Sequence, residues 1–180
     1  MWVGLSREPT RKIIQQALAR HAPGARVWWG DLADPTFDAE IALSIDPNPS
    51  EFPFVINGWV VGGQESHQYE LGLRLAEELC VMLDCSTICD GSHHGPTKSP
   101  YWSIIWQRGV PFLADDCGTL FADYSDGLSL EERRQLRPVK ILHPIQIDPW
   151  PFDFSAPSPS TAAAPSPRAS AAARGAAPRA

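Results

Sequence analysis

Residues 52–90 decide the fold of this chain, and they read FPFVINGWVVGGQESHQYELGLRLAEELCVMLDCSTICD. An apolar run at 52–61 leads through Gly62 and Gly63 into a segment, 65–84, whose apolar residues recur every three or four positions. That spacing places them on one face of a helix. A short segment at 86–90 follows, and Gly91 ends it. We therefore predict strand, helix, strand, with the helix covering a sheet to which both strands belong.

The predicted helix carries a wide apolar stripe, as expected of a helix that packs against a sheet. Its members are Tyr69, Leu71, Leu73, Leu75, Ala76, Leu79, Cys80, Met82 and Leu83. Gly72 interrupts the stripe and should cost about 1 kcal/mol relative to Ala. We attribute this glycine to a close approach between the helix and a strand.

The rest of the chain adds more strands than helices. Ser6 can cap a helix from Arg7 to about Ala22. Strands are predicted at 1–5, 26–30, 37–46, 101–107, 110–114, 119–123 and 139–147, and a short helix at 128–136. Arg108 and Gly109 form a hairpin turn, and Pro144 indicates an edge or bulged strand. This order predicts an α+β fold: a two-layer sandwich of a mixed, mostly antiparallel β-sheet with two main helices packed on one face.

Composition divides the chain into two parts. Residues 155–180 contain 11 Ala and 5 Pro and no aromatic residue, so they cannot bury a core and we expect them to be disordered. Residues 1–154 are long enough for a single globular domain that is stable without disulfides or bound metals.

Charge limits the partners that the domain can bind. The formal net charge is −6, but the tail holds three of the 15 basic residues and none of the 21 acidic ones, so residues 1–154 carry −9. A domain this acidic repels nucleic acid and anionic membrane surfaces and suits a basic protein. No apolar run approaches the ~20 residues that span a bilayer. The N-terminus lacks the features of a secretory signal, so we expect a cytoplasmic protein with reduced thiols.

The four cysteines raise the possibility of a metal site. Its ligands would be Cys85, Cys89 and His93, in the spacing Cys85-x3-Cys89-x3-His93, with Cys80 or His94 as the fourth. Zinc ligands usually come as close pairs. On a strand, a spacing of four holds two residues about 13 Å apart, too far to share one ion. We predict buried free thiols and no metal site.

No cofactor is predicted either. Gly62 and Gly63 precede a helix, as in phosphate-binding loops. The glycine pattern of such loops and their following Lys are missing, which argues against nucleotide binding.

Nucleophilic catalysis is the enzymatic alternative. Cys89 or Cys117 could act as the nucleophile, with His93 or His94 as the base and Asp90 as an orienting group. Proximity in the sequence does not establish the required geometry. A small cysteine/histidine-dependent hydrolase or transferase is therefore kept as the second hypothesis.

An acidic cluster follows the second strand of the predicted hairpin. It consists of Asp115, Asp116, Asp123 and Asp126. The regular alternation of a calcium-binding loop is absent, so solvated turns are the simpler interpretation.

Seven tryptophans are many for this length, and two of them, Trp102 and Trp106, share one side of the strand that leads into the acidic cluster. Most tryptophans fill the core, but an exposed Trp beside acidic residues is typical of a protein-binding face. We predict that Trp102, Trp106 and the four aspartates form such a face.

These features favour a non-enzymatic, acidic, protein-binding domain with a basic partner. In size, acidity, tryptophan content and α+β pattern the chain resembles the small immunity proteins that bacteria make against basic toxin domains. The resemblance is one of general properties and transfers no site residue. It implies an inhibitor that neutralises a toxin domain. A third hypothesis is a structural component that forms homodimers through an edge strand.

Overall fold

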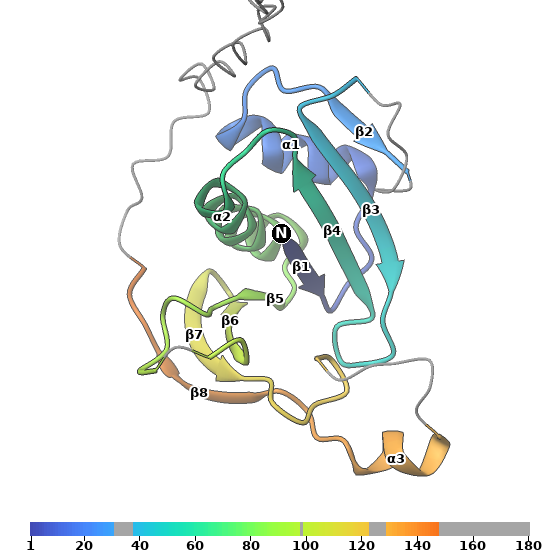
Figure 1. Cartoon of the computed structure of the whole chain (residues 1–180), viewed down its shortest axis with the longest axis vertical. Helices are drawn as coiled ribbons and strands as arrows, with labels where there is room; N and C mark the ends of the chain where they lie inside the picture. Colours follow the sequence, from blue (N-terminus) through green and yellow to red (C-terminus); the bar gives the residue numbers. More distant parts are fainter. Residues whose placement is uncertain (31–37, 98, 123–128, 148–180) are drawn as a thin grey trace, which may run out of the picture.

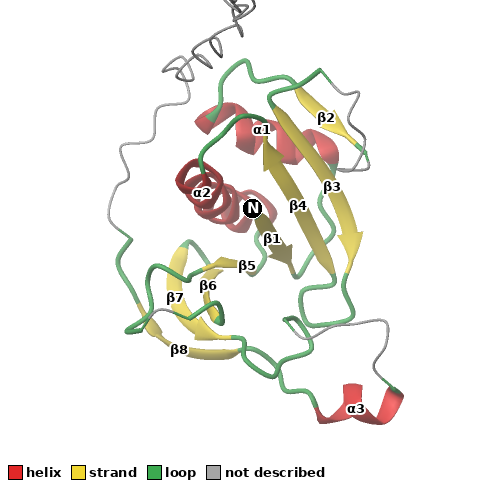
Figure 2. Ribbon diagram, in the orientation of Figure 1, coloured by secondary structure: helices red, strands yellow, loops and turns green. Residues whose placement is uncertain are grey.

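The structure, a computed structural model, describes residues 1–30, 38–97, 99–122 and 129–147 (Figures 1 and 2). Its elements are β1 (Trp2–Leu5), α1 (Arg11–His21), β2 (Val27–Trp29), β3 (Ile41–Pro47), β4 (Phe54–Val60), α2 (Glu65–Leu83), β5 (Thr87–Asp90), β6 (Trp102–Gln107), β7 (Val110–Asp115), α3 (Leu130–Gln135) and β8 (Lys140–Pro144). The predicted tail, residues 155–180, lies outside the described residues.

All eight strands form one open sheet in the order β2-β3-β4-β1-β5-β6-β7-β8. Strands β2 and β3 are parallel, and every other neighbouring pair is antiparallel. Helices α1 and α2 lie on the same side of this sheet (Figure 1). The prediction of an α+β fold with a mixed, mostly antiparallel sheet and two main helices on one face is confirmed.

Two crossovers interlock at the centre of the sheet. Strand β1 continues through α1 to β2 at the sheet edge, and β3 and β4 lie between these two strands. Strand β4 continues through α2 to β5, and β1 lies between those two. Both crossovers join parallel strands, and the second skips a single antiparallel strand, as in split β-α-β motifs. The arrangement brings the start of β1, the end of β4 and the end of β5 to the N-terminal half of α2.

The main core lies between the sheet and the two helices. The apolar stripe of α2 is buried there with Ile14 and Leu18 of α1 and with Ile56 of β4. A Cβ added to Gly72 would lie 3.4 Å from Met1 Cβ and 3.9 Å from the Trp2 carbonyl oxygen. The predicted close approach to a strand is therefore present, but at ordinary contact distance.

The other face of the sheet is covered over one half. Phe52, Ile88, Ile105 and Ala114 form a second core there, against which Trp2, Phe121 and Val139 pack. Phe121 stands over the sheet, with its ring centroid 5.3 Å from that of Trp2. On the half that contains β3 and β4, the side chains are Ser44, Asp46, Val55, Asn57 and Trp59, which we call the open-face patch.

The start of the first helix differs from the prediction. Helix α1 begins at Arg11, and Thr10 caps it by accepting a hydrogen bond from the Ile13 backbone. Ser6 instead exchanges hydrogen bonds with the Ser86 backbone and ties the end of β1 to the start of β5. Pro9 therefore precedes the helix.

The second half of the sheet follows the predicted turns, with one exception. Arg108 and Gly109 both have positive φ angles, of 51° and 76°, as a tight hairpin turn requires. Pro144 ends β8 at the sheet edge. The prediction of a strand at 119–122 is wrong: Thr119 makes an isolated bridge with Arg137, and Asp123 lies outside the described residues.

Candidate functional site

Trp59 is an exposed aromatic side chain of the open-face patch. Strand β4 turns Ile56, Gly58 and Val60 toward the helices, so Asn57 and Trp59 face away from them. The Trp59 side chain is 53% exposed, although a ring of this size is usually well covered. Its cross-strand neighbour, Ala42, has no exposed surface. The patch therefore presents a large aromatic ring on a rigid, central strand.

The strands of the sheet supply acidic residues to this surface, and Arg11 of α1 lines a hollow beside Asp46. Strands β1 to β7 contain three aspartates, Asp46, Asp90 and Asp115, and no Lys or Arg. Ser44 Oγ and Asn57 Nδ2 both donate hydrogen bonds to Asp46 Oδ2, at 2.7 and 2.9 Å. These bonds hold the carboxylate in place without neutralising its charge.

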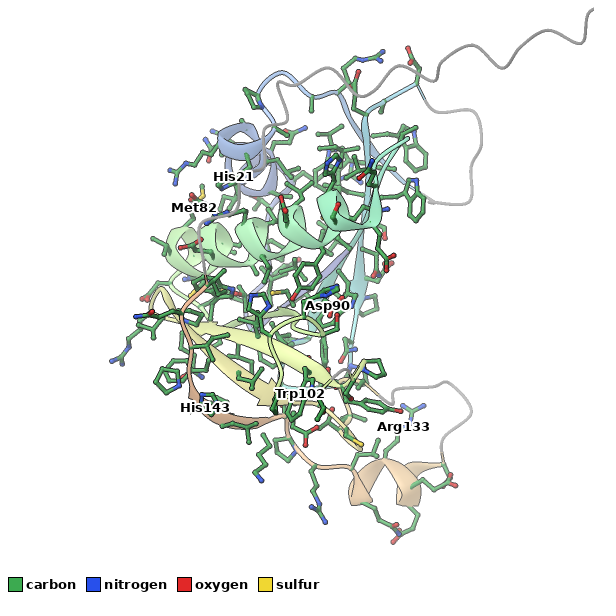
Figure 3. The ribbon with its side chains drawn as sticks, turned by 60° about the vertical axis from the view of Figure 1, so that its left-hand side comes forward. His21, Met82, Asp90, Trp102, Arg133 and His143 are labelled. Atoms are coloured by element: carbon green, nitrogen blue, oxygen red, sulfur yellow. The ribbon has the colours of Figure 1, made fainter. Side chains whose placement is uncertain are left out.

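A groove adjoins the patch where the start of β1 meets α2. A pocket of about 440 Å³ lies there, lined by Met1, Trp2, Trp59, Gly63, Glu65, Gln68, Tyr69, Gly72, Asp90, Ser92 and His93. Glu65, Ser92 and His93 also line an adjoining hollow of about 830 Å³ that extends to Pro100. Figure 3 shows Asp90 between α2 and the start of β6, which Trp102 marks. Trp59 thus belongs both to the open-face patch and to the groove.

The wall formed by residues 91–97 is fixed by side-chain contacts. The Ser92 backbone N–H donates to Asp90 Oδ1 at 2.8 Å and turns the chain at the end of β5. The Tyr69 hydroxyl is hydrogen-bonded to His94 Nδ1 at 2.7 Å, and its ring lies edge-on to His93 with centroids 4.7 Å apart. Burial, with Asp90 as a second cause, raises the pKa of Tyr69, so the hydroxyl stays protonated.

Trp102 supports the far side of the same wall. Its indole nitrogen donates to the Thr97 carbonyl oxygen at 2.8 Å. A Cβ on Gly95 would lie 2.1 Å from the Trp102 ring, so only glycine fits beneath it. Trp102, predicted as a docking residue, is half-buried and holds the groove wall in place.

The groove contains carboxylates without ion pairs. Within the described residues, neither Asp90 nor Glu65 lies within 4.0 Å of a basic nitrogen. The Met1 amino group also lines the pocket and donates to the Gly58 carbonyl oxygen at 2.8 Å. Burial lowers its pKa, and Asp90 acts in the opposite direction.

Cys89 and Cys117, the two candidate nucleophiles, donate hydrogen bonds to Ile104 and Asp115. Cys89 is 1% exposed, and its thiol donates to the Ile104 carbonyl oxygen at 3.8 Å. Burial raises the pKa of Cys89, which keeps the thiol neutral and unreactive. Cys117 is exposed, and its backbone N–H donates to Asp115 Oδ1 in a turn. His93 and His94 lie in the groove wall, as described above.

Of the predicted acidic and aromatic face, the structure buries Trp106 and Asp116 and places Trp102 opposite Asp115 on neighbouring strands. Trp106 is 3% exposed and belongs to the main core, because its side of β6 faces the helices. Asp116 is also 3% exposed and accepts a hydrogen bond from Ser103 Oγ, so it cannot contact a partner either. Asp115 is half-buried at the end of β7, and Asp123 and Asp126 lie outside the described residues.

The sequence carries one signal for the residues that this prediction missed. In β4, Asn57 and Trp59 alternate with Ile56, Gly58 and Val60, so the polar residue and the exposed tryptophan share a face. Asn-Gly is also a common turn sequence, and this conceals the alternation. Asp46 lies on the same face of the neighbouring strand, opposite Val55.

All four cysteines are free thiols. Within the described ranges, no group of three or more His, Cys, Asp or Glu side chains is arranged to hold a metal ion. None of the described helices combines the length and the apolar character needed to cross a membrane. Comparisons with protein-family models, with curated proteins and with solved structures find no match to this chain.

Proposed function

We propose that this chain is a non-enzymatic protein-binding domain that docks on a basic protein through the open-face patch. The observation that carries the proposal is the half-exposed ring of Trp59 on a central strand, in a sheet whose first seven strands contain no Lys or Arg. Exposed aromatic rings supply much of the affinity of protein interfaces, and complementary charge speeds encounter. Asp46 is the acidic member of this patch.

The cysteine/histidine hydrolase has less support. Its better-placed thiol, Cys89, is inaccessible and protonated. Cys117 is exposed but is held in a turn by Asp115. His94 is hydrogen-bonded to the Tyr69 hydroxyl and positions the groove wall. Each of these residues therefore has a structural role.

The finer form of the proposal is an immunity-type inhibitor. A chain with a net charge of −9 over residues 1–154 suits a basic toxin domain as its target. Four free cysteines suit the reducing cytoplasm, where we propose that the chain acts. If the partner is a toxin domain, co-expression of this chain should restore growth to cells that produce the partner.

The test begins with recovery of the partner from native host cells on the immobilised wild-type chain. Its dissociation constant is then measured for wild type, Trp59→Ala and Val81→Ala. Val81 is a matched control because it is apolar and 61% exposed, but it lies on α2. We expect Trp59→Ala to weaken binding roughly 30-fold or more, as a hot-spot tryptophan does.

Asp46→Asn keeps an oxygen that can accept from Ser44 while it removes the charge. We expect it to slow association at low salt and to reduce the dependence of the association rate on salt. Two results would show that docking uses another surface. One is an unchanged affinity of the partner for Trp59→Ala, and the other is a loss of affinity for Val81→Ala.

A further inference from the structure

We propose that the pocket between Trp59 and Asp90 receives an arginine side chain of the basic partner. The inference rests on the proposed function for the source of the arginine, and it identifies the part of the partner that the groove recognises. The pocket has a volume of about 440 Å³ and opens beside the open-face patch. A partner seated on the patch can therefore extend one side chain into it.

The lining of the pocket matches a guanidinium group. Trp59 offers a half-exposed ring, and a planar cation stacks on such a ring. Asp90 and Glu65 offer carboxylates that form no ion pair within 4.0 Å in the described part of the chain, and the Met1 amino group of the same lining acts on Asp90 from a longer distance. Asp90 Oδ1 accepts from Ser92, which leaves Oδ2 to accept from a ligand. Arginine combines stacking and carboxylate pairing in one side chain, whereas lysine is a point charge.

Gln68 gives a second and independent indication of a ligand. Its side chain lines the pocket and is 9% exposed. Its Oε1 accepts a long hydrogen bond, of 3.5 Å, from the Met1 amino group. Its amide nitrogen makes no hydrogen bond within the described residues and is not among their fully buried unpaired atoms, so a ligand in the pocket can reach it. A carbonyl oxygen of the peptide that carries the arginine would accept this hydrogen bond.

Other ligand classes fit the pocket less well. A phosphate or a carboxylate would be repelled by Asp90 and Glu65. The described residues hold no cluster of ligands for a metal ion. A purely apolar group would leave the Gln68 amide without a partner and the carboxylates partly desolvated.

The test uses the full chain with ¹⁵N-labelled indoles and a small probe, N-acetyl-L-arginine amide. The neutral isostere N-acetyl-L-citrulline amide is the matched ligand. We expect the arginine probe to shift the indole signals of Trp59 and Trp2 saturably, and the citrulline probe to leave them in place. Asp90→Asn retains the oxygen that accepts from Ser92, so the turn is kept while the charge is lost. We expect it to weaken the probe roughly tenfold.

Asp84→Asn is the matched control, since Asp84 lies beyond the opposite end of α2 with a left-handed backbone that Asn tolerates. If Asp90→Asn does not fold, Glu65→Gln replaces it, because Glu65 is exposed and its loss disturbs no packing. Equal shifts with both probes, or unchanged affinity in the Asp90 and Glu65 variants, would overturn the inference.

The partner separates this inference from the proposed function. If Trp59→Ala releases the partner and Asp90→Asn does not, the pocket is not the arginine site and the docking surface stands. If neither variant weakens the complex, the docking surface itself is wrong. If both variants weaken the complex but the citrulline probe binds as tightly as the arginine probe, the pocket does not recognise charge, and the inference fails.

Discussion

The two faces of β4 show how one strand can serve two purposes. Toward the helices, Ile56 is fully buried and Gly58 is covered, with Met1 and Leu43 at the place where a side chain would be. Away from them, Asn57 hydrogen-bonds Asp46, and Trp59 stands half in solvent. The first face contributes to the core, and the second presents an aromatic and acidic surface.

Two tryptophans of the sheet, Trp106 on β6 and Trp59 on β4, differ in the same way in their exposure to solvent. Trp106 is 3% exposed and Trp59 is 53% exposed. The difference follows from strand parity, because β6 directs Trp106 under α2, whereas β4 directs Trp59 away from both helices. Tryptophan content alone therefore does not identify an interface; the covered face of the sheet must be known first.

The largest effect on folding should come from the buried tryptophan. We expect Trp106→Ala to lower the free energy of unfolding by about 3–5 kcal/mol, because it removes a large ring from the main core. Urea denaturation followed by circular dichroism measures the loss. A change below about 1 kcal/mol would mean that the core under α2 does not depend on this ring.

Two glycines near the groove should respond in opposite directions. A Cβ at Gly91 would lie 2.6 Å from the Ser103 backbone carbon, so we expect Gly91→Ala to cost about 1–3 kcal/mol. At Gly72 the nearest atom is 3.4 Å away, so Gly72→Ala should stabilise α2 by up to about 1 kcal/mol. Thermal melts of the two variants compare them, and the same sign for both would contradict the packing described here.

The buried thiol should make stability depend on alkaline pH. Because the pKa of Cys89 is raised in the folded state, the unfolded chain loses this proton first, above about pH 9. The contribution is fully present below that pH and is lost as the pH rises, by at most ~1.4 kcal/mol per pH unit. Denaturation at pH 8 and pH 10, for wild type and Cys89→Ala, isolates it. The variant should show the shallower decline, and equal declines would place the thiol in contact with water.

The exposed tryptophan should have the smallest effect on stability. We expect Trp59→Ala to change the free energy of unfolding by less than about 1 kcal/mol, since much of its ring already contacts solvent. Paired with the loss of 3–5 kcal/mol expected at Trp106, this result would establish that the two faces have different roles. A loss at Trp59 comparable to that at Trp106 would mean that the open-face patch is part of the core.

The sequence predicts the layers of the fold, but it does not predict which strand residues lie on the exposed face of the sheet. The helical period at 65–84 and the alternation in the strands determine the elements, since they arise from local geometry. Which face of β6 lies under α2 depends on the interlocked crossovers, and no local pattern encodes those. The aspartates at 115 and 116 illustrate the limit: they are adjacent in sequence, yet Asp116 is buried against Ser103 and Asp115 lies at a strand end.

The groove was also hidden from the sequence for a physical reason. Gln68, Asp90 and Trp59 come from α2, β5 and β4, and they meet only because both crossovers bring these elements to one end of the sheet. The sequence does mark His93 and His94 as candidate bases. Their contacts with Tyr69 give them a structural role in the wall of the pocket.

The most direct test of the docking surface is to observe the seven tryptophans while the partner binds. The chain is labelled with 5-fluorotryptophan, and the ¹⁹F signals are assigned by single Trp→Phe substitutions. Addition of the basic partner recovered on the wild-type chain should shift or broaden the Trp59 signal most and leave that of Trp106 unchanged. A complex that forms while the Trp59 signal stays in place would contradict the account.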